Sequence, residues 1–334
     1  MAHSDGGGTV LFPRGDRVTG SLLGLAIGDA VGFAVEGAPA AAARTYADQL
    51  GPALEGARAH PGFSFGQYSD DTILARELVA AAMPGRVDLD RFVQGCLAAH
   101  RDGGIVGAGP GTTGTLERIL AGVPWQEAAT PAPYAGNGAA MRAGPLGALF
   151  ADTVALAGEA AMLQARLTHA DPRAVAGAGV VARAVAVAAR PGPLDADRFL
   201  AEVDGDECLL PRAELLGWLR LPLEAAAARA RRLDEGPRGA GAGLSPCVVP
   251  TVAWALFSFL RSPDDYAETI RTAIWIGGDT DTLGAMAGAI SGARVGLAAL
   301  PPRLIAVLHD RGRWTGPELV ALAESALTRV GSGA

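Results

Sequence analysis

Glycine recurs at every fourth position in two segments, one near each end of the chain. The two rows are Gly20, Gly24, Gly28 and Gly32, and Gly284, Gly288, Gly292 and Gly296. Because residues i and i+4 lie one above the other on a helix, each row predicts a helix with a groove free of side chains. An interior glycine destabilises a helix by about 0.5–1 kcal/mol relative to alanine. Each groove is therefore expected to pack against another element.

Glycine rows of this kind also occur where transmembrane helices pack together. Charged residues argue against a membrane here, because Asp29 lies inside the first row and Asp279, Asp281 and Arg294 interrupt or flank the second. We therefore predict close contact between helices in a water-soluble core.

The rest of the chain is dominated by helix signals. Helices are predicted at 88–100, 171–190, 221–233, 304–308 and 319–327, and a buried core helix within 239–260. Alternating β-branched runs are nearly absent, and the most that is expected is a short hairpin around 63–68. The fold class is predicted as all-α, a compact single-domain orthogonal bundle of about a dozen helices. Residues 1–15 are expected to be a flexible tail and 16–330 the domain.

The composition excludes several functions. The net charge of −7 argues against sequence-independent binding of nucleic acid. All 28 residues counted as Lys or Arg are arginine, which excludes a Schiff-base, P-loop or general-base lysine. The three cysteines, at 96, 208 and 247, have no CxxC spacing and are expected to be buried thiols in a reducing compartment. With no signal peptide visible, a cytoplasmic location is expected, with no membrane partner.

Two loops concentrate acidic and hydroxyl residues, Ser69-Asp70-Asp71-Thr72 and Asp279-Thr280-Asp281-Thr282. Each precedes an apolar helix, so helix capping is one explanation. Four acids with extra hydroxyls exceed what capping needs, and hard divalent cations such as Mg²⁺ and Mn²⁺ prefer such oxygen ligands. If the loops meet, they could hold two metals about 3.5–4 Å apart that orient one water.

Five segments together resemble the signature segments of the ADP-ribosylglycohydrolase family. In chain order they are GSLLGLAIGDAVGFAVE, SDDT, GNGAAMR, LTHADPRA and GGDTDTLGAMAGAISGARVG. The resemblance spans Gly20 to Gly296. The family includes the dinitrogenase reductase-activating glycohydrolases and the ADP-ribosyl-acceptor hydrolases. It implies a compact all-α fold with two Mg²⁺ or Mn²⁺ ions in a cleft.

The resemblance also implies roles for particular residues. The metal ligands would be Ser69, Asp70, Asp71, Asp279, Asp281 and Thr282, with Asp281 bridging. Glu36 would position the nucleophilic water or sense the metal. The catalytic candidates are Glu36, Asp70 and Asp281. The ADP-ribose cleft would be lined by Gly109, Thr113, Asn137, Gly138, Met141 and His169. The first triplet usually opens with threonine, and Ser69 departs from that pattern while keeping the hydroxyl oxygen.

The implied function is a metal-dependent hydrolase that cleaves the bond between the ribose of ADP-ribose and an acceptor, on a protein side chain such as Arg or Ser or on a small molecule. Two alternatives stay open, namely hydrolysis of another N- or O-glycoside and a non-catalytic homologue that binds ADP-ribose or metal. If Glu36 meets the second acidic loop, the two glycine-row helices are expected to run antiparallel.

Two further motifs match other functions by their letters. Gly62-Phe-Ser64-Phe-Gly66 matches the nucleophile elbow GxSxG, but no strand precedes it and an acidic loop follows. Gly109 to Gly114 matches GxGxxG, but Pro110 removes a backbone donor and no strand leads in. Neither a serine hydrolase nor a dinucleotide-binding fold is therefore expected, although the second loop could present backbone N–H groups to a pyrophosphate.

Overall fold

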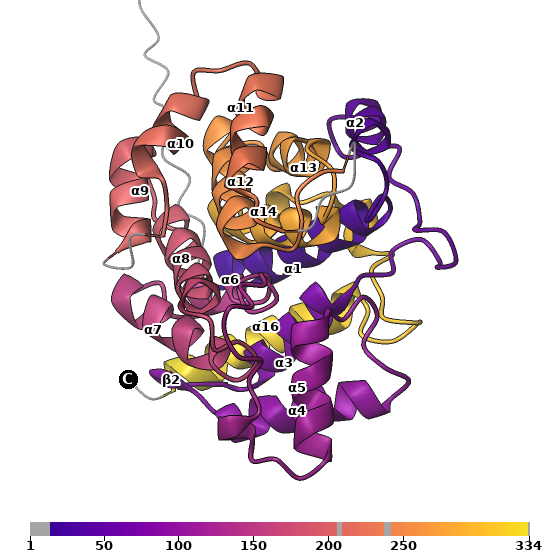
Figure 1. The fold of residues 1–334 in the computed structure, drawn as a ribbon, viewed down its shortest axis with the longest axis vertical. Helices are drawn as coiled ribbons and strands as arrows, with labels where there is room; N and C mark the ends of the chain where they lie inside the picture. The colour runs from indigo at the N-terminus through magenta and orange to yellow at the C-terminus, as the bar shows by residue number, and fades with distance from the viewer. Residues whose placement is uncertain (1–13, 206–208, 237–241, 333–334) are drawn as a thin grey trace, which may run out of the picture.

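The two glycine-row helices form the centre of the molecule (Figure 1). The structure, a computed structural model, describes residues 14–205, 209–236 and 242–332. Its α-helices are α1 (Arg14–Phe33), α2 (Ala40–Gln49), α3 (Asp70–Ala80), α4 (Leu89–Arg101), α5 (Pro110–Leu120), α6 (Gly144–Leu149), α7 (Val154–Ala165), α8 (Pro172–Ala188), α9 (Ala196–Asp204), α10 (Arg212–Trp218), α11 (Leu223–Ala230), α12 (Val248–Arg261), α13 (Tyr266–Trp275), α14 (Thr280–Val295), α15 (Pro302–Ile305) and α16 (Gly316–Gly331). Two short strands, β1 (Ala82–Met83) and β2 (Arg86–Val87), and three 3₁₀ turns, η1 (Trp125–Glu127), η2 (Arg231–Leu233) and η3 (Leu297–Ala299), complete the described elements.

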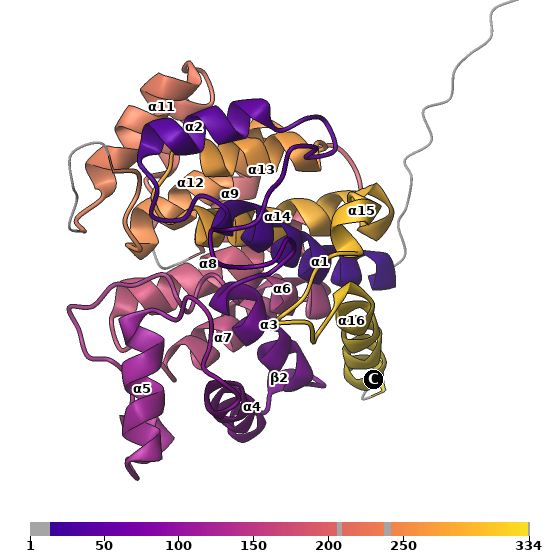
Figure 2. The same cartoon turned by 90° about the vertical axis from the view of Figure 1, so that its right-hand side faces the viewer.

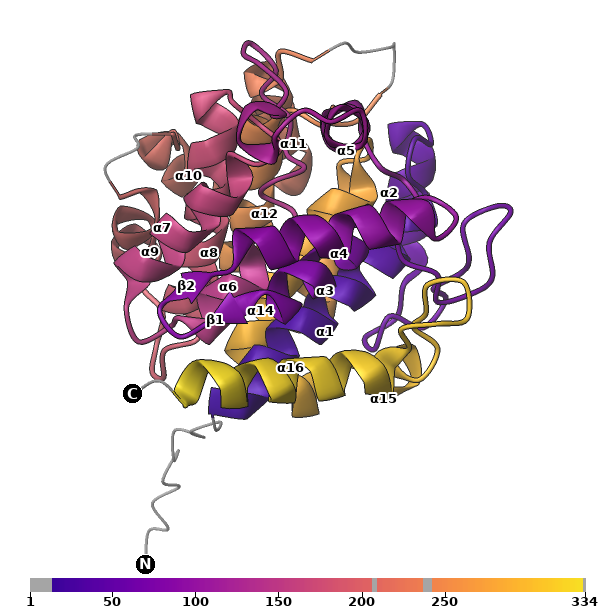
Figure 3. The same cartoon turned by 90° about the horizontal axis from the view of Figure 1, so that it is seen from below.

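The expected all-α class is confirmed. Helix α14 contacts α8, α12 and α13, and α1 contacts α3, α6 and α16. In Figure 2, α4 and α5 lie at one end of the molecule and α2 and α11 at the other, with the central pair between them. Helix α16 packs against α1 and crosses it obliquely in Figure 3. None of the described helices combines the length and hydropathy that spanning a membrane would need.

The glycine rows face each other, antiparallel as expected. An added Cβ at Gly24 would lie 2.4 Å from the carbonyl oxygen of Gly288, and one at Gly28 would lie 2.0 Å from that of Gly284. Gly20 faces Gly292 in the same way. At such distances no side chain fits between the two helices, so their backbones are in direct contact. The second glycine-row helix ends one residue earlier than expected. Helix α14 ends at Val295, and Gly296 is its C-cap, with a φ of +78°.

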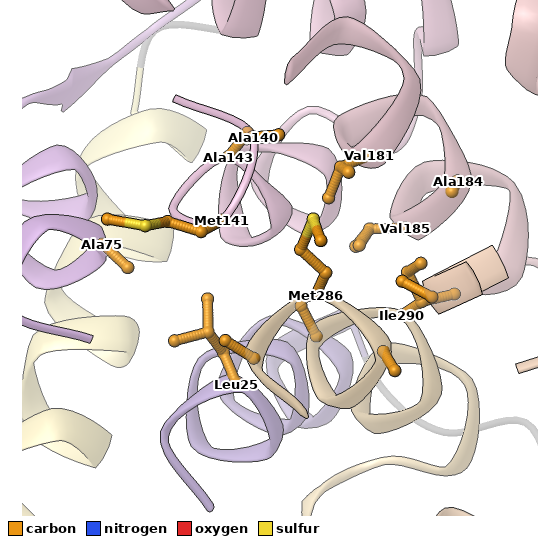
Figure 4. Close-up of a cluster of buried hydrophobic side chains, with 14 of the residues drawn as sticks. Leu25, Ala75, Ala140, Met141, Ala143, Val181, Ala184, Val185, Met286 and Ile290 are labelled. Atoms are coloured by element: carbon orange, nitrogen blue, oxygen red, sulfur yellow. The ribbon is translucent and has the colours of Figure 1, made fainter. Parts of the chain in front are cut away.

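Buried apolar side chains fill the space between the central pair and the helices α3 and α8. Figure 4 shows Met286 of α14 directed towards Val181 and Val185 of α8, while Leu25 of α1 lies near Ala75 of α3. All five are buried, and they belong to one continuous cluster of apolar side chains. The core therefore continues from this face of the glycine-row pair into α3 and α8.

Several predicted elements are confirmed, with shifts at their ends. Helices α4 and α8 begin at the expected caps, where the Asp88 side chain accepts a hydrogen bond from Arg91 N (3.1 Å) and Asp171 accepts one from Arg173 N (2.9 Å). The segment 221–233 divides into α11 and η2, and α15 ends three residues early. Helix α12 begins inside the expected apolar stretch and ends one residue beyond it, at Arg261. Residues 1–13 of the predicted tail lie outside the described residues, and α1 already begins at Arg14. The boundaries of a single domain over 16–330 stay a prediction.

The hairpin expected at 63–68 is wrong. That segment forms turns, in which Phe63 packs edge-on against Phe33 with ring centroids 5.2 Å apart. The antiparallel pair is instead β1 and β2, which reverse direction at Pro84 and Gly85, and Gly85 has a φ of +65°. Pro-Gly is a typical turn signal that the sequence interpretation did not use.

Candidate active site

The two acidic loops meet at one place in the structure. Oxygen atoms of Asp29, Asp71 and Asp281 all lie within 4.8 Å of one another, and so do those of Glu36, Asp279 and Asp281. Asp281 belongs to both groups, which we call the two carboxylate trios. Asp71 and Asp281, 210 positions apart in the sequence, are thus brought together.

The glycine-row contact produces this convergence. An added Cβ at Gly32 would lie 2.1 Å from the carbonyl oxygen of Thr280, and the Thr280 hydroxyl donates to the carbonyl oxygen of Gly32 (2.8 Å). The C-terminal end of α1 is therefore attached to the N-terminal end of α14. One turn further on, Gly37 N–H donates to the carbonyl oxygen of Gly278 (3.3 Å), which places Glu36 beside the second acidic loop.

Asp29, near the C-terminal end of α1, anchors the first acidic loop. It is fully buried and accepts hydrogen bonds from the backbone N–H groups of Ser69 (2.9 Å) and Thr72 (3.0 Å), and from the Thr72 hydroxyl (2.6 Å). Sequence reasoning used this residue only as evidence against a membrane helix. A carboxylate inside the otherwise uncharged run 22–33 was the signal that could have identified it.

Capping does not explain the acidic loops. Ser69 and Asp279 occupy the N-cap positions of α3 and α14, but neither side chain caps its helix. The Ser69 hydroxyl donates instead to Asp71 Oδ2 (3.0 Å), and Asp279 Oδ2 accepts from the Asn137 amide (2.6 Å). The side chains are therefore directed into the cluster of carboxylates.

Six carboxylates in the cluster lack a cationic partner. They are Asp29, Glu36, Asp70, Asp71, Asp279 and Asp281, and within the described chain none of them is hydrogen-bonded or ion-paired to an arginine or histidine. Asp71 Oδ1 is buried with no hydrogen-bond partner. Buried charges require pairing or a metal. A set of carboxylate and hydroxyl oxygens matches the preference of hard divalent cations, so the residues present fit such an ion.

Burial and mutual repulsion raise the pKa values of these carboxyl groups. Loss of solvation, followed by the charges of Asp279 and Asp29, raises the pKa of Glu36 to about 7. Loss of solvation and the neighbouring carboxylates raise the pKa of Asp70 to about 8, and burial raises that of Asp29 to about 6. The pKa values of Asp71 and Asp281 are raised well above their usual range for the same reasons.

These shifts predict that the metal-free protein loses stability as the pH rises. A carboxyl whose pKa is higher in the folded state binds protons more tightly there than in the unfolded chain. Its stabilising contribution is complete below the unfolded pKa of about 4 and is lost as the pH rises through the folded values, about 7 for Glu36 and about 8 for Asp70. In EDTA, the melting temperature should therefore fall between about pH 5 and pH 8, and added Mn²⁺ should reduce this fall. A pH profile identical with and without metal would contradict the prediction.

Four of the six carboxylates, those of Glu36, Asp70, Asp279 and Asp281, line a cavity of about 530 Å³. Most of the predicted site residues line it, namely Glu36, Asp70, Gly109, Asn137, Gly138, Met141, His169, Asp279, Asp281 and Thr282. The cavity lining does not include Ser69 or Asp71. Asp71 contacts a lining residue, since its Oδ2 is 3.5 Å from the Thr282 hydroxyl, and Ser69 is hydrogen-bonded to Asp71. Met141 is only 3% exposed and also belongs to the apolar core beside Ala75 (Figure 4).

One predicted cleft residue is placed elsewhere. Thr113 does not line the cavity, and its hydroxyl donates to the carbonyl oxygen of Ala108 (3.3 Å). Thr112 lines the cavity in its place, because α5 begins at Pro110 and successive helical residues point in directions about 100° apart. Sequence reasoning also missed Tyr134, whose ring stacks on His169 with centroids 5.7 Å apart.

The cysteines and the two other motifs are placed differently with respect to this site, and residues of the GxGxxG match, among them Gly109 and Gly111, line the cavity. Cys96 is buried as expected, Cys247 is only half-buried and lines the cavity, and Cys208 lies outside the described residues. The GxGxxG match forms the start of α5 after a loop, and the described strands are confined to 82–87.

Ser64, in the GxSxG match, lies 3.0 Å from His309 Nε2. Because Gly312 N–H donates to His309 Nδ1 (3.3 Å), the proton of the neutral ring lies on Nε2. His309 therefore donates to Ser64 and cannot act as its base, so this pair is not an activated nucleophile.

Replacing Asp281 by asparagine should weaken Mn²⁺ binding by about 100-fold or more, because a residue common to both trios loses its charge. Asp265→Asn is the matched control. Asp265 caps α13 by accepting from Glu268 N (2.9 Å), and asparagine caps equally well. Titration calorimetry of both variants with Mn²⁺ measures the difference, and equal affinities would show that Asp281 holds no metal.

These features define an all-α protein with a cavity lined in part by a cluster of carboxylates suited to hard divalent cations. A family model described as ADP-ribosylglycohydrolase matches residues 12–333. The chain belongs to the ADP-ribosylglycohydrolase family, and it is a glycosyl hydrolase by that membership.

Relatives extend the comparison over most of the chain. The ADP-ribosylarginine hydrolase Tri1 of Pseudomonas putida is 27% identical over 87% of this chain and 73% of its own length. The ADP-ribosylhydrolase ARH3 of Danio rerio is 29% identical over 85% of this chain and 84% of its own. A solved structure titled "ADP-ribosylglycohydrolase-related protein complex" is 31% identical, covers 95% of this chain and 98% of its own, and superimposes with a TM-score of 0.62.

Proposed function

We propose that this protein hydrolyses the glycosidic bond between the anomeric carbon of ADP-ribose and an acceptor, with two Mg²⁺ or Mn²⁺ ions. The observation that carries the proposal is the sharing of Asp281 by two carboxylate trios beside the cavity. Similarity to hydrolases that act on ADP-ribosylated substrates supports the ligand class. The substrate would be an ADP-ribosylated protein or a small-molecule ADP-riboside.

The two acidic loops would hold the ions through Ser69, Asp70, Asp71, Asp279, Asp281 and Thr282. When bound, the ions would supply positive charge that orients a water molecule and lowers its pKa. The Asn137 amide would keep Asp279 in place through its hydrogen bond of 2.6 Å. Asp29 would keep the first loop in place through the backbone of Ser69 and Thr72.

Glu36 would act as the general base. One proton of the water would pass to the Glu36 carboxylate while the water oxygen forms a bond to the anomeric carbon. The bond from that carbon to the acceptor breaks, its electron pair stays with the acceptor, and the acceptor takes up the proton that Glu36 received. A pKa of about 7 suits a base that works near neutral pH. The nearby carboxylates would stabilise the positive charge that develops on the ribose.

The rest of the ADP-ribosyl group would occupy the cavity away from the carboxylates. The first turn of α5 faces this space, and no side chain caps it. A helix N-terminus favours anions, so the pyrophosphate would lie there, beside Gly109 and Gly138. Met141 would form part of the apolar wall of the cavity next to the ligand.

Release of ADP-ribose from a panel of defined linkages tests the proposal. The panel contains ADP-ribosyl-arginine, ADP-ribosyl-serine and a small-molecule ADP-riboside, each with Mg²⁺, Mn²⁺ or EDTA. We expect turnover of at least one linkage with metal and none with EDTA. Binding of ADP-ribose without turnover would indicate a non-catalytic homologue, and turnover of other glycosides alone would indicate the alternative substrate class.

A further inference from the structure

A chain of hydrogen bonds runs from the protein interior to His169. Its first member is the Gln164 amide, whose Nε2 donates to the carbonyl oxygens of Ala139 and Ala161, both at 3.0 Å. These two acceptors fix the amide so that Oε1 faces the other way. Gln164 Oε1 accepts a hydrogen bond from Arg142 Nε (2.7 Å), and Arg142 is fully buried.

The direction of the next two hydrogen bonds follows from the chemistry of the groups. Arg142 Nη2 lies 2.9 Å from Thr168 Oγ1, which lies 2.8 Å from His169 Nδ1. Arginine has no acceptor atom, so Thr168 Oγ1 accepts from it. The hydroxyl proton then needs an acceptor, and within the described chain His169 Nδ1 is the one in range. A proton on Nδ1 would leave the buried hydroxyl without an acceptor, which is unfavourable.

The other ring nitrogen of His169 faces the cavity. His169 is 1% exposed and lines the cavity, and its Nε2 has no hydrogen-bond partner among the described residues. An added Cβ at Gly111 would lie 3.1 Å from Nε2, and one at Gly138 would lie 3.6 Å from it. Gly111 belongs to the uncapped first turn of α5. The nitrogen is therefore directed to the place where backbone N–H groups already favour an anion.

We propose that Arg142 and Thr168 are positioning residues that hold His169 as the uncharged tautomer with its proton on Nε2, from which it donates a hydrogen bond to a phosphate oxygen of the ligand. The ligand assignment rests on the proposed function, whereas the tautomer rests on the hydrogen bonds alone. Burial, and secondarily the charge of Arg142, lower the pKa of His169 to about 3. The ring therefore stays neutral at physiological pH, and its hydrogen bond to the ligand does not depend on protonation.

Nitrogen NMR of the ligand-free protein tests the tautomer directly, because protonated and unprotonated ring nitrogens have distinct chemical shifts. The chain has five histidines, so a His169→Asn spectrum assigns the signal. We expect an unprotonated Nδ1 and a protonated Nε2 in the wild type. Thr168→Val, which removes the hydroxyl at similar volume, should add the other tautomer, and Thr168→Ser should restore the wild-type pattern. A wild-type ring protonated on Nδ1 would overturn the inference, as would a Thr168→Val spectrum unchanged from the wild type.

Calorimetry with ADP-ribose tests the consequence for binding. Thr168→Val should weaken the affinity by about tenfold, the equivalent of one hydrogen bond, while Thr168→Ser stays within about twofold of the wild type. Equal affinity of the valine variant and the wild type would overturn the role in binding. If the wild type does not bind ADP-ribose, the proposed function is wrong, and the NMR result still decides the tautomer.

Discussion

Replacement of Glu36 by glutamine should lower turnover by about 10²–10⁴-fold, the usual contribution of a general base. Glutamine preserves the size of the side chain but cannot take a proton from water. Mn²⁺ and ADP-ribose affinities should change much less than turnover. Turnover of the most reactive linkage is measured at saturating Mn²⁺, and both affinities are measured by calorimetry.

Glu324→Gln, on the exposed face of α16, is the control and should leave turnover unchanged. The structure also places Glu36 in a trio with Asp279 and Asp281, a position from which it could hold a metal. Equal losses of metal affinity and turnover would assign Glu36 to that role and remove it as the base.

Replacement of Gly288 by leucine should lower the free energy of unfolding by about 3 kcal/mol or more, the upper end of the usual cost of overpacking. An added Cβ would lie 2.2 Å from the carbonyl oxygen of Gly24, and a backbone atom cannot move aside as a side chain can. Separation of α1 from α14 would also displace Asp281, which α14 carries, so activity should fall as well. Urea unfolding and the turnover assay measure both effects.

Gly217→Ala provides a matched glycine control. Gly217 lies within α10, and an added Cβ there meets nothing within 4 Å. Alanine should raise the stability by about 0.4–1 kcal/mol through its better helix propensity and a less flexible unfolded chain. If Gly288→Leu unfolds at the same urea concentration as the wild type, the contact between the glycine rows does not stabilise the fold.

The parts of the site that sequence reasoning identified are those with a local pattern. The glycine rows predict helices with bare faces because helical periodicity places residues four apart on one side. The pairs Asp70-Asp71 and Asp279-Asp281 are recognisable because they exceed the needs of capping, and neither loop uses its first residue as a cap. Glu36 came from the family resemblance alone.

The parts that it missed depend on partners far away in the chain. Asp29 has no neighbours of its own kind, and its role appears only where Ser69 and Thr72, 40 and 43 residues away, donate to it. The family resemblance pointed to Thr113, whereas Thr112 lines the cavity, because the rotation of α5 relative to the cavity is set by packing. The hairpin was misplaced because residues 63–68 form turns, in which Phe63 packs against Phe33, a residue 30 positions away.

The sequence by itself determined the all-α class, the central pair of glycine-row helices and the two acidic loops, because each is encoded within a few residues. The tertiary structure decided that the loops form one cluster, since direct contact between Gly32 and the backbone of Thr280 attaches the end of one helix to the start of the other. It also decided that Asp281 is common to both trios and that His169 presents Nε2 to the cavity. These properties arise from distances between segments, and distances of that kind follow from the packing of whole helices.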